Sequence, residues 1–279
     1  MNILEFTGVI TLGSFVAGFL GSITGLGGGV VIVPLLALAL GVDIRYAIGA
    51  SLVSVIATSS GAAAAYVKEG FSNIRIGVFL EIATSSGALI GAFLAAKLPT
   101  SFIGVVFGVV LLYSAYQAVT AKAEHAASFG SSDRLALRLK MEGTYPGDHG
   151  LVRYHVRAVP LGFGLMAIAG LLSGLLGIGS GAVKVIAMDQ IMGIPFKVST
   201  ATSNFMIGVT AAASAGIYLS RGYIDPGLAM PVTLGVLAGS AFGARFLTTA
   251  RTPLLRKIFS AVISIMALEM IYNSISGRL

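Results

Sequence analysis

Long apolar stretches separated by short charged joints make up most of this chain. Most stretches are about 20 residues long, enough for a helix to cross the ~30 Å hydrocarbon core of a bilayer. The predicted apolar segments are 8–24, 29–41, 46–67, 74–97 and 100–121, followed by 158–176, 181–193, 198–220, 226–248 and 253–275. The pattern predicts an all-α polytopic membrane protein.

Two of these segments are short, and each follows a cluster of glycines. As helices, 29–41 and 181–193 would reach only about 20 Å. The clusters are Gly25–Gly29 and Gly177–Gly181. Because glycine at this density breaks a helix, each half is expected to contain a Gly-broken helical hairpin followed by three transmembrane helices.

The two glycine clusters are 152 positions apart, and identical residues recur at this offset through much of both halves. Tyr66 and Gly70, for example, correspond to Tyr218 and Gly222. The repetition predicts an internal duplication. We expect a first membrane repeat at 1–121, a polar linker at 122–157 and a second membrane repeat at 158–279.

The linker carries an alternating pattern of apolar and charged residues on both sides of a turn cluster at 146–150. The alternating apolar positions are Leu135, Leu137, Leu139 and Met141, then Val152, Tyr154 and Val156. Period-two alternation around a turn predicts a β-hairpin outside the membrane. A short amphipathic helix at 133–141 is the alternative. The three histidines show no metal-ligand spacing, and no metal or cofactor is expected.

The distribution of Lys and Arg discriminates between three topologies for the broken segments: one broken span, two full spans, or a re-entrant hairpin. The last two models place thirteen of the Lys and Arg residues between the spans on one membrane face and four on the other, whereas a single broken span places ten on one face and seven on the other. The positive-inside rule favours the stronger bias. It implies an odd number of crossings per half, hence an inverted repeat with a cytoplasmic central loop. Re-entrant and fully spanning hairpins both stay open.

Composition narrows the class of protein further. The chain is 56% hydrophobic and 10% charged, with no cysteine, whereas soluble domains are about 25% charged. A water-soluble globule and thiolate chemistry are therefore excluded. The net charge of +7 follows from basic joints between spans, so no nucleic-acid partner is expected.

The glycine clusters are the predicted binding elements. A helix starts after each cluster, its first amides lack intrahelical acceptors, and glycine allows a ligand to approach the backbone. Two such tips entering from opposite faces and meeting near mid-bilayer would form an anion site. The predicted contacts are Gly27, Gly28 and Gly29 in the first half and Gly179, Ser180 and Gly181 in the second. Tight helix packing is the alternative role.

Polar residues next to the tips extend this candidate site. Lys184 lies in the first turn after Gly181, where a charge at membrane depth indicates function; snorkelling to an interface is the alternative. Further candidates are Thr202, Ser203, Asn204 and, in the first half, Ser51. Their hydroxyls could instead bond to the helix backbone. Glu81 could carry a coupling proton or pair with Lys184, and a structural carboxylate is an equal alternative.

The segments GSITGLGGGVVIVPLL with GASLVS, and GLLSGLLGIGSG with STATSN, resemble the TauE/SafE family of sulfite exporters and related permeases. The similarity covers both membrane halves. The second cluster departs from the pattern of the first, because Ser180 replaces a glycine and Ile186 stands at the position that corresponds to Pro34. The resemblance implies a bacterial inner-membrane permease for sulfite, organosulfonates or carboxylates.

Taken together, we expect a secondary transporter of small anions that works by alternating access, with sulfur oxyanions as the first choice of substrate. A passive anion channel or a carrier of small carboxylates is the alternative. A scaffold subunit is a further possibility, and an enzyme is not expected because no acid–base pair, HExxH or GxSxG occurs at membrane depth. The expected partners are the anion and the lipid bilayer. Proton coupling and the oligomeric state stay open.

Overall fold

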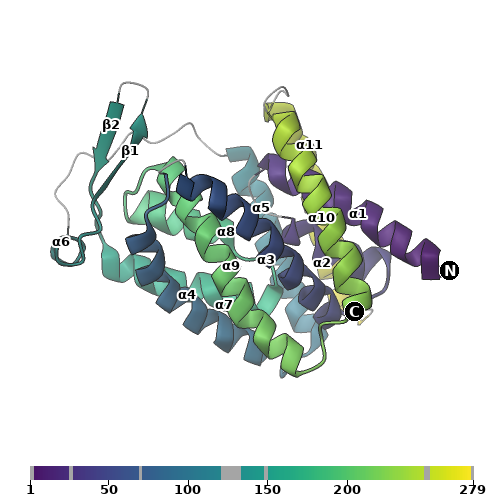
Figure 1. Ribbon diagram of the computed structural model, residues 1–279. Coiled ribbons are helices and arrows are strands. Elements are labelled where there is room, and N and C mark those ends of the chain that lie inside the picture. Colours follow the sequence, from purple (N-terminus) through teal and green to yellow (C-terminus); the bar gives the residue numbers. More distant parts are fainter. Residues whose placement is uncertain are drawn as a thin grey trace.

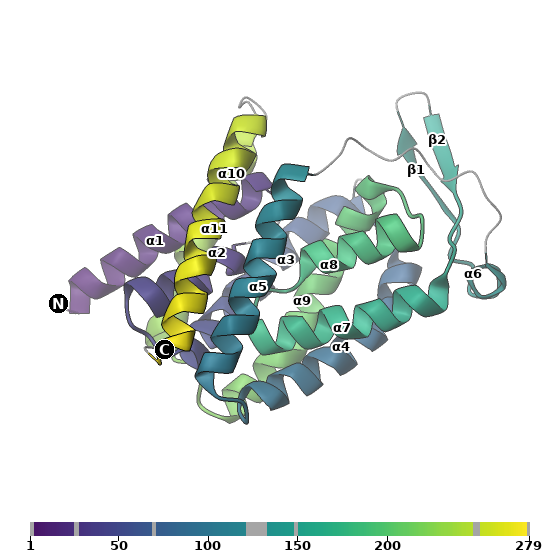
Figure 2. The same ribbon diagram turned by 180° about the vertical axis from the view of Figure 1, so that it is seen from behind.

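The computed structural model describes residues 3–24, 28–68, 71–120, 133–147, 150–247 and 252–277. It is a bundle of helices from which a small two-stranded sheet projects at the end away from both termini (Figures 1 and 2). The fold is all-α apart from this sheet, as the apolar pattern predicts. The four helical segments Ile74–Ala95, Thr100–Gln117, Val159–Leu176 and Pro226–Gly243 are long and apolar enough to cross a membrane.

The helices of the first half are α1 (Ile3–Thr24), α2 (Gly29–Pro34), the π-helical turn η1 (Leu35–Ala39), α3 (Ile44–Lys68), α4 (Ile74–Ala95) and α5 (Thr100–Thr120). Those of the second half are α7 (Val159–Leu176), α8 (Gly181–Ile186), the π-helical turn η2 (Ala187–Ile191), α9 (Phe196–Ser220), α10 (Pro226–Leu247) and α11 (Thr252–Ile275). Both glycine clusters thus lie between a long helix and a short one.

The helix boundaries of the two halves repeat with the offset of the sequence. Each of α2, η1, α3 and α4 begins and ends 152 residues before its counterpart α8, η2, α9 and α10. Equal boundaries follow from equal placement of glycine, polar joints and apolar runs, so this regularity supports the predicted duplication.

The two halves pack by exchanging partners. The most extensive contacts are between α1 and α10 and between α4 and α7, so the first helix of each half lies along the fourth helix of the other. The pairs α3 with α9 and α5 with α11 complete the bundle. These four pairings join the two halves: α3 and α5 each pair with their own repeat counterparts, whereas α1 pairs with the counterpart of α4 and α7 pairs with the counterpart of α10.

Glycines make the exchanged contacts close. A Cβ atom added at Gly87 would collide with the Ala167 carbonyl oxygen, and one at Gly170 with the Thr84 carbonyl oxygen. A Cβ at Gly239 would likewise collide with the Phe15 carbonyl oxygen. Backbone therefore meets backbone at these crossings, which is how small residues drive helix association in lipid.

The linker forms a hairpin, but at a different register from the one predicted. Strands β1 (Gly143–Gly147) and β2 (Gly150–Tyr154) pair antiparallel, with Gly147 opposite Gly150. The predicted first strand at 135–141 is wrong. Part of this segment instead forms the short helix α6 (Arg134–Arg138), which buries Ala136 and lies within the alternative helix expected at 133–141. The strands pair as far as Gly147 and Gly150, and the alternating residues further upstream fall partly in the helix. Residues 148 and 149 lie outside the described residues.

Candidate functional site

The two glycine tips meet inside the bundle, as far as they lie within the described residues. A Cβ atom placed on Gly29 of the first tip would lie 3.3 Å from the Gly177 carbonyl oxygen of the second tip and 2.8 Å from the Ser51 hydroxyl. The Ser51 hydroxyl donates a hydrogen bond of 2.8 Å to the same carbonyl oxygen. The predicted contact Gly27 lies outside the described residues, while Gly28 packs against Val236 of α10.

The second tip needs glycine for its backbone conformation. Gly177 and Gly179 have φ values of 69° and 71°, a left-handed conformation that glycine adopts without steric cost. Ser180 also has a positive φ, 42°, and its hydroxyl donates to the Ala169 carbonyl oxygen at 2.5 Å. The loop therefore turns back from α7 so that α8 can start at Gly181 beside α9.

Lys184 projects from α8 into the interior of the bundle and is completely buried. Its ammonium nitrogen Nζ donates a hydrogen bond of 2.6 Å to the Thr210 hydroxyl on α9. An ammonium group removed from water is costly unless polar partners compensate it. Lys184 is therefore held inside the protein instead of snorkelling to a membrane surface.

Glu81 on α4 supplies the opposite charge. The Thr210 hydroxyl donates to Glu81 Oε1 at 2.7 Å, so Lys184, Thr210 and Glu81 form one buried chain. Thr84 and Ser85 donate to the two carboxylate oxygens of Glu81, at 2.8 Å and 2.7 Å. Hydroxyl groups thus surround a carboxylate that is only 8% exposed.

This buried chain, which we call the Lys184–Thr210–Glu81 bridge, joins the two halves of the protein. Glu81 belongs to the first repeat, and the other two residues belong to the second. The bridge is formally neutral, because one cation faces one anion across a hydroxyl. Burial of such a pair is tolerated when its hydrogen bonds are complete, and losing one partner leaves an uncompensated charge.

The polar run at the start of α9 is largely used for packing. Ser203 donates to the Gly181 carbonyl oxygen at 3.4 Å, and the Asn204 amide donates to the Thr200 carbonyl oxygen at 3.1 Å. Thr202 accepts a hydrogen bond of 3.0 Å from the backbone nitrogen of Asn73. The buried hydroxyl of Thr200 has no hydrogen-bond partner among the described residues.

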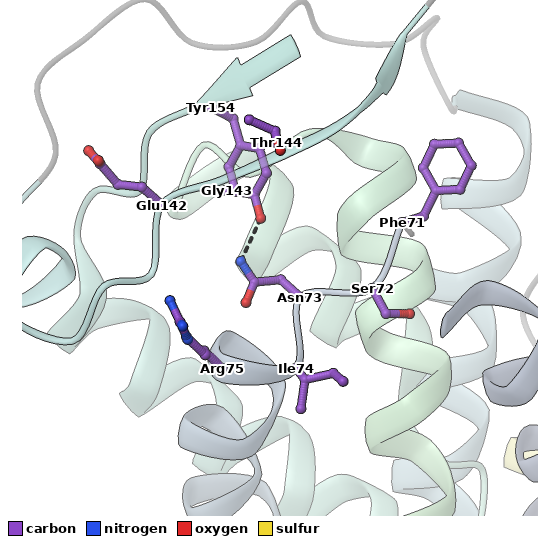
Figure 3. Close-up of a pocket in the computed structure, with 9 residues that line it drawn as sticks. All are labelled: Phe71, Ser72, Asn73, Ile74, Arg75, Glu142, Gly143, Thr144 and Tyr154. Carbon is purple, nitrogen blue, oxygen red and sulfur yellow. Dashed lines mark hydrogen bonds between the residues drawn. The ribbon is translucent and has the colours of Figure 1, made fainter. Parts of the chain in front are cut away.

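Asn73 fixes the hairpin to the membrane helices (Figure 3). Its side-chain oxygen caps α4 by accepting from the Ile76 backbone nitrogen at 3.1 Å. Its amide nitrogen donates to the Tyr154 phenol oxygen at 2.6 Å and to the Met141 carbonyl oxygen at 3.1 Å. Burial raises the pKa of Tyr154, and the hydrogen bond from Asn73 partly offsets that shift. The phenol therefore stays neutral in this contact.

A pocket of about 280 Å³ lies between this hairpin and the loop that leads into α4. Arg75, Glu142, Thr144 and Tyr154 are among the residues that line it, and Figure 3 shows them around Asn73. An adjoining pocket of about 320 Å³ adds Lys140 and Arg153. Both lie outside the bundle interior. Among the described residues, no three His, Cys, Asp or Glu side chains gather to hold a metal.

The sequence indicated Lys184 and Glu81 as members of this site but not Thr210. One signal was present, because Thr210 and Thr58 occupy the same position in the two repeats. In the structure the hydroxyl of Thr58 bonds only to backbone carbonyl oxygens of its own helix among the described residues. The shared repeat position therefore does not reveal that Thr210 has a different role. Asn73 was not identified at all, since the register of the hairpin was wrong.

Comparison with known proteins gives a consistent family. The family model described as "Sulfite exporter TauE/SafE" matches residues 10–270. The chain is 28% identical to the probable membrane transporter protein YunE of Bacillus subtilis, over 98% of this chain and 99% of that protein. It is 27% identical to the probable membrane transporter protein YdhB of the same organism, over 85% and 89% of the two chains.

A third relative is the probable membrane transporter protein ORF9 of Sinorhizobium sp, which is 22% identical over 92% of this chain and 89% of its own length. No solved structure matches the chain.

Proposed function

Because the chain belongs to the sulfite exporter TauE/SafE family of membrane transporters, we propose that it carries small anions across the bilayer by alternating access. Sulfite, organosulfonates or related sulfur oxyanions are the proposed substrates. One observation carries the proposal: the ammonium group of Lys184 is completely buried within a helical bundle, next to the tip where a helix restarts. A fixed positive charge at this depth is the feature that an anion site requires.

The surroundings of Lys184 support this assignment. Gly181 starts α8 one turn before the lysine, and Ser51, Gly29 and Gly177 come together where the tips meet. The proposed contacts are the tip residues Gly27, Gly28, Gly29, Gly179, Ser180 and Gly181 together with Ser51, Lys184, Thr202, Ser203 and Asn204. An anion that bound there would touch elements of both repeats.

The closed packing of the bridge supports alternating access over an open pore. Lys184 and Thr210 have no accessible surface, so an anion reaches the lysine only if the helices around it separate. The exchanged pairs α1 with α10 and α4 with α7 are the most extensively packed pairs, and we propose that they move as units against α3 and α9. We place the protein in the inner membrane with its linker in the cytoplasm, as the thirteen-to-four division of basic residues favours.

Binding and flux measurements test the proposal. Purified protein is screened by thermal shift against sulfite, sulfate, thiosulfate, ethanesulfonate and acetate, and flux of the anions that bind is followed in proteoliposomes. We expect at least one sulfur oxyanion to raise the melting temperature of the wild type. Lys184→Met should abolish this shift and reduce anion flux to the level of protein-free liposomes. Lys97→Ala, which removes an exposed cation, should behave as the wild type.

Loss of folding must be separated from loss of binding. Lys184→Met alone leaves the Glu81 carboxylate without its counter-charge, which destabilises the protein. The double variant Lys184→Met/Glu81→Gln contains no charge in the bridge, so it leaves no uncompensated buried charge. We expect this variant to fold and to transport nothing. Wild-type flux in either variant would remove Lys184 from the site.

A further inference from the structure

Glu81 occupies the position that the transported anion needs. In the closed bundle its carboxylate compensates the charge of Lys184 through the Thr210 hydroxyl. This hydroxyl lies 2.7 Å from Glu81 Oε1 and 2.6 Å from Lys184 Nζ. A substrate anion that binds the ammonium group must take over this role. Two anions would then face one buried cation, and an uncompensated buried charge is strongly destabilising.

We propose that the substrate displaces the Glu81 carboxylate from Thr210 and that Glu81 then binds one proton from the solvent, so that each anion is carried together with a proton. The inference rests on the function proposed above and identifies its co-transported ion. The balance is simple: the anion gains the hydrogen bonds of Thr210 and Lys184, and the proton forms an O–H bond on the released carboxylate. For a monovalent anion the net charge of the site is zero before and after binding.

The surroundings of Glu81 suit both forms of the carboxyl group. On α4 itself, Thr84 and Ser85 donate hydrogen bonds to the ionised form, and their oxygens can equally accept a hydrogen bond from the O–H group of the neutral acid. Lys184 of α8 is the charged group that faces Glu81, and Thr210 is the polar group that faces it from α9. The residues of α7 that pack on α4 near this level, Ala167 and Gly170, are uncharged.

The bridge also explains how anion binding is coupled to movement of one repeat against the other. While Glu81 is ionised, the bridge ties α4 of the first repeat to α8 and α9 of the second. Binding of anion and proton together removes this tie without leaving a net buried charge, so the repeats can separate. Binding of the anion alone leaves the site negative, and the proton alone leaves it positive. Only the empty and the doubly occupied protein can cross between states at low cost.

Calorimetry on the purified full-length protein tests the inference directly. Ethanesulfonate, which is monovalent, is titrated at pH 7 in buffers that differ in ionisation enthalpy, because it does not itself take up protons at that pH. The divalent anions thiosulfate and sulfate are titrated in the same way for comparison. The dependence of the apparent enthalpy on the buffer gives the protons taken up per anion bound. We expect a value close to one for the wild type and close to zero for Glu81→Gln, which should still bind anion.

The control is Glu269→Gln, which removes an exposed carboxylate of α11 and should leave the uptake near one proton. Flux provides the second measurement: an imposed proton gradient should accumulate the anion in wild-type proteoliposomes and fail to do so with Glu81→Gln. Binding without proton uptake in the wild type, or uptake unchanged in Glu81→Gln, would overturn this inference and leave the anion site intact. Failure of the wild type to bind any of these three anions, together with no response to sulfite in the thermal-shift screen, would overturn the proposed function and this inference with it.

Discussion

A single hydroxyl group connects the two buried charges of this protein. Thr210 accepts from Lys184 and has one proton to give, which it can direct to Glu81 or to the Met206 carbonyl oxygen at 2.8 Å. A threonine is well suited to this role because its hydroxyl accepts and donates at once. The residue therefore acts as a positioning group between the two charged side chains.

Replacement of Thr210 by valine should weaken both stability and transport. The shape is retained, but the buried ammonium and carboxylate groups lose their shared partner, at a cost of about 1–3 kcal/mol. We expect a lower melting temperature and loss of most anion flux. Thr58→Val is the matched control, because the hydroxyl at this repeat position bonds only to carbonyl oxygens of its own helix among the described residues. Equal effects of the two changes would contradict the bridging role.

At the scale of elements, the start of α4 is where the hairpin and the membrane bundle meet. One side chain, Asn73, caps the helix and holds Tyr154 and Met141. Its backbone nitrogen also bonds to Thr202 of α9. Glu81 lies two turns further along α4, so the hairpin is attached to the same helix that carries one end of the bridge.

Two substitutions at Asn73 should separate capping from docking. Asn73→Ala loses the cap, worth about 1 kcal/mol, and also the two bonds to the hairpin. Asn73→Ser can still cap α4, but it lacks the amide donor. We expect faster hydrogen exchange at 141–154 in both variants, and a lower melting temperature chiefly in Asn73→Ala. Protection of the hairpin that is unchanged in both variants would show that Asn73 does not hold it.

The exchanged helix pairs depend on glycine at their crossings. Gly170→Val would drive a side chain into the Thr84 backbone, so we expect destabilisation of about 3 kcal/mol and loss of flux. Gly164→Val is made on the same helix, at a position with no neighbouring atoms within 4 Å of an added Cβ among the described residues. It should be tolerated. Thermal melting in detergent, followed by size-exclusion chromatography, distinguishes the two outcomes.

The elements of the membrane halves could be predicted closely, whereas the linker could not. Span boundaries follow from glycine, proline and charged joints, and these signals are strong in a lipid environment. In the linker the same apolar alternation fits a strand or a short helix, and packing decides: Ala136 and Met141 are buried, while Leu137 is exposed. The bridge was predictable only in part, because its geometry depends on which faces of α4, α8 and α9 meet.

For the whole molecule, the proposed orientation in the membrane rests on the distribution of basic residues. The chain has no cysteine, so a single Leu151→Cys on the exposed side of the hairpin gives an unambiguous reporter. We expect a membrane-impermeant maleimide to label it in inside-out vesicles and not in intact cells until the membrane is opened. Labelling of intact cells would reverse the topology and place the linker outside.

The exchange of helices between the halves has a consequence for how the protein is made. When α1 leaves the ribosome, its main partner α10 is still about 200 codons away, and α4 must likewise wait for α7. The first half therefore enters the bilayer with unpaired glycine-lined surfaces and with Glu81 lacking its lysine. Biogenesis of the mature carrier can finish only late in translation, when the second half arrives to cover them.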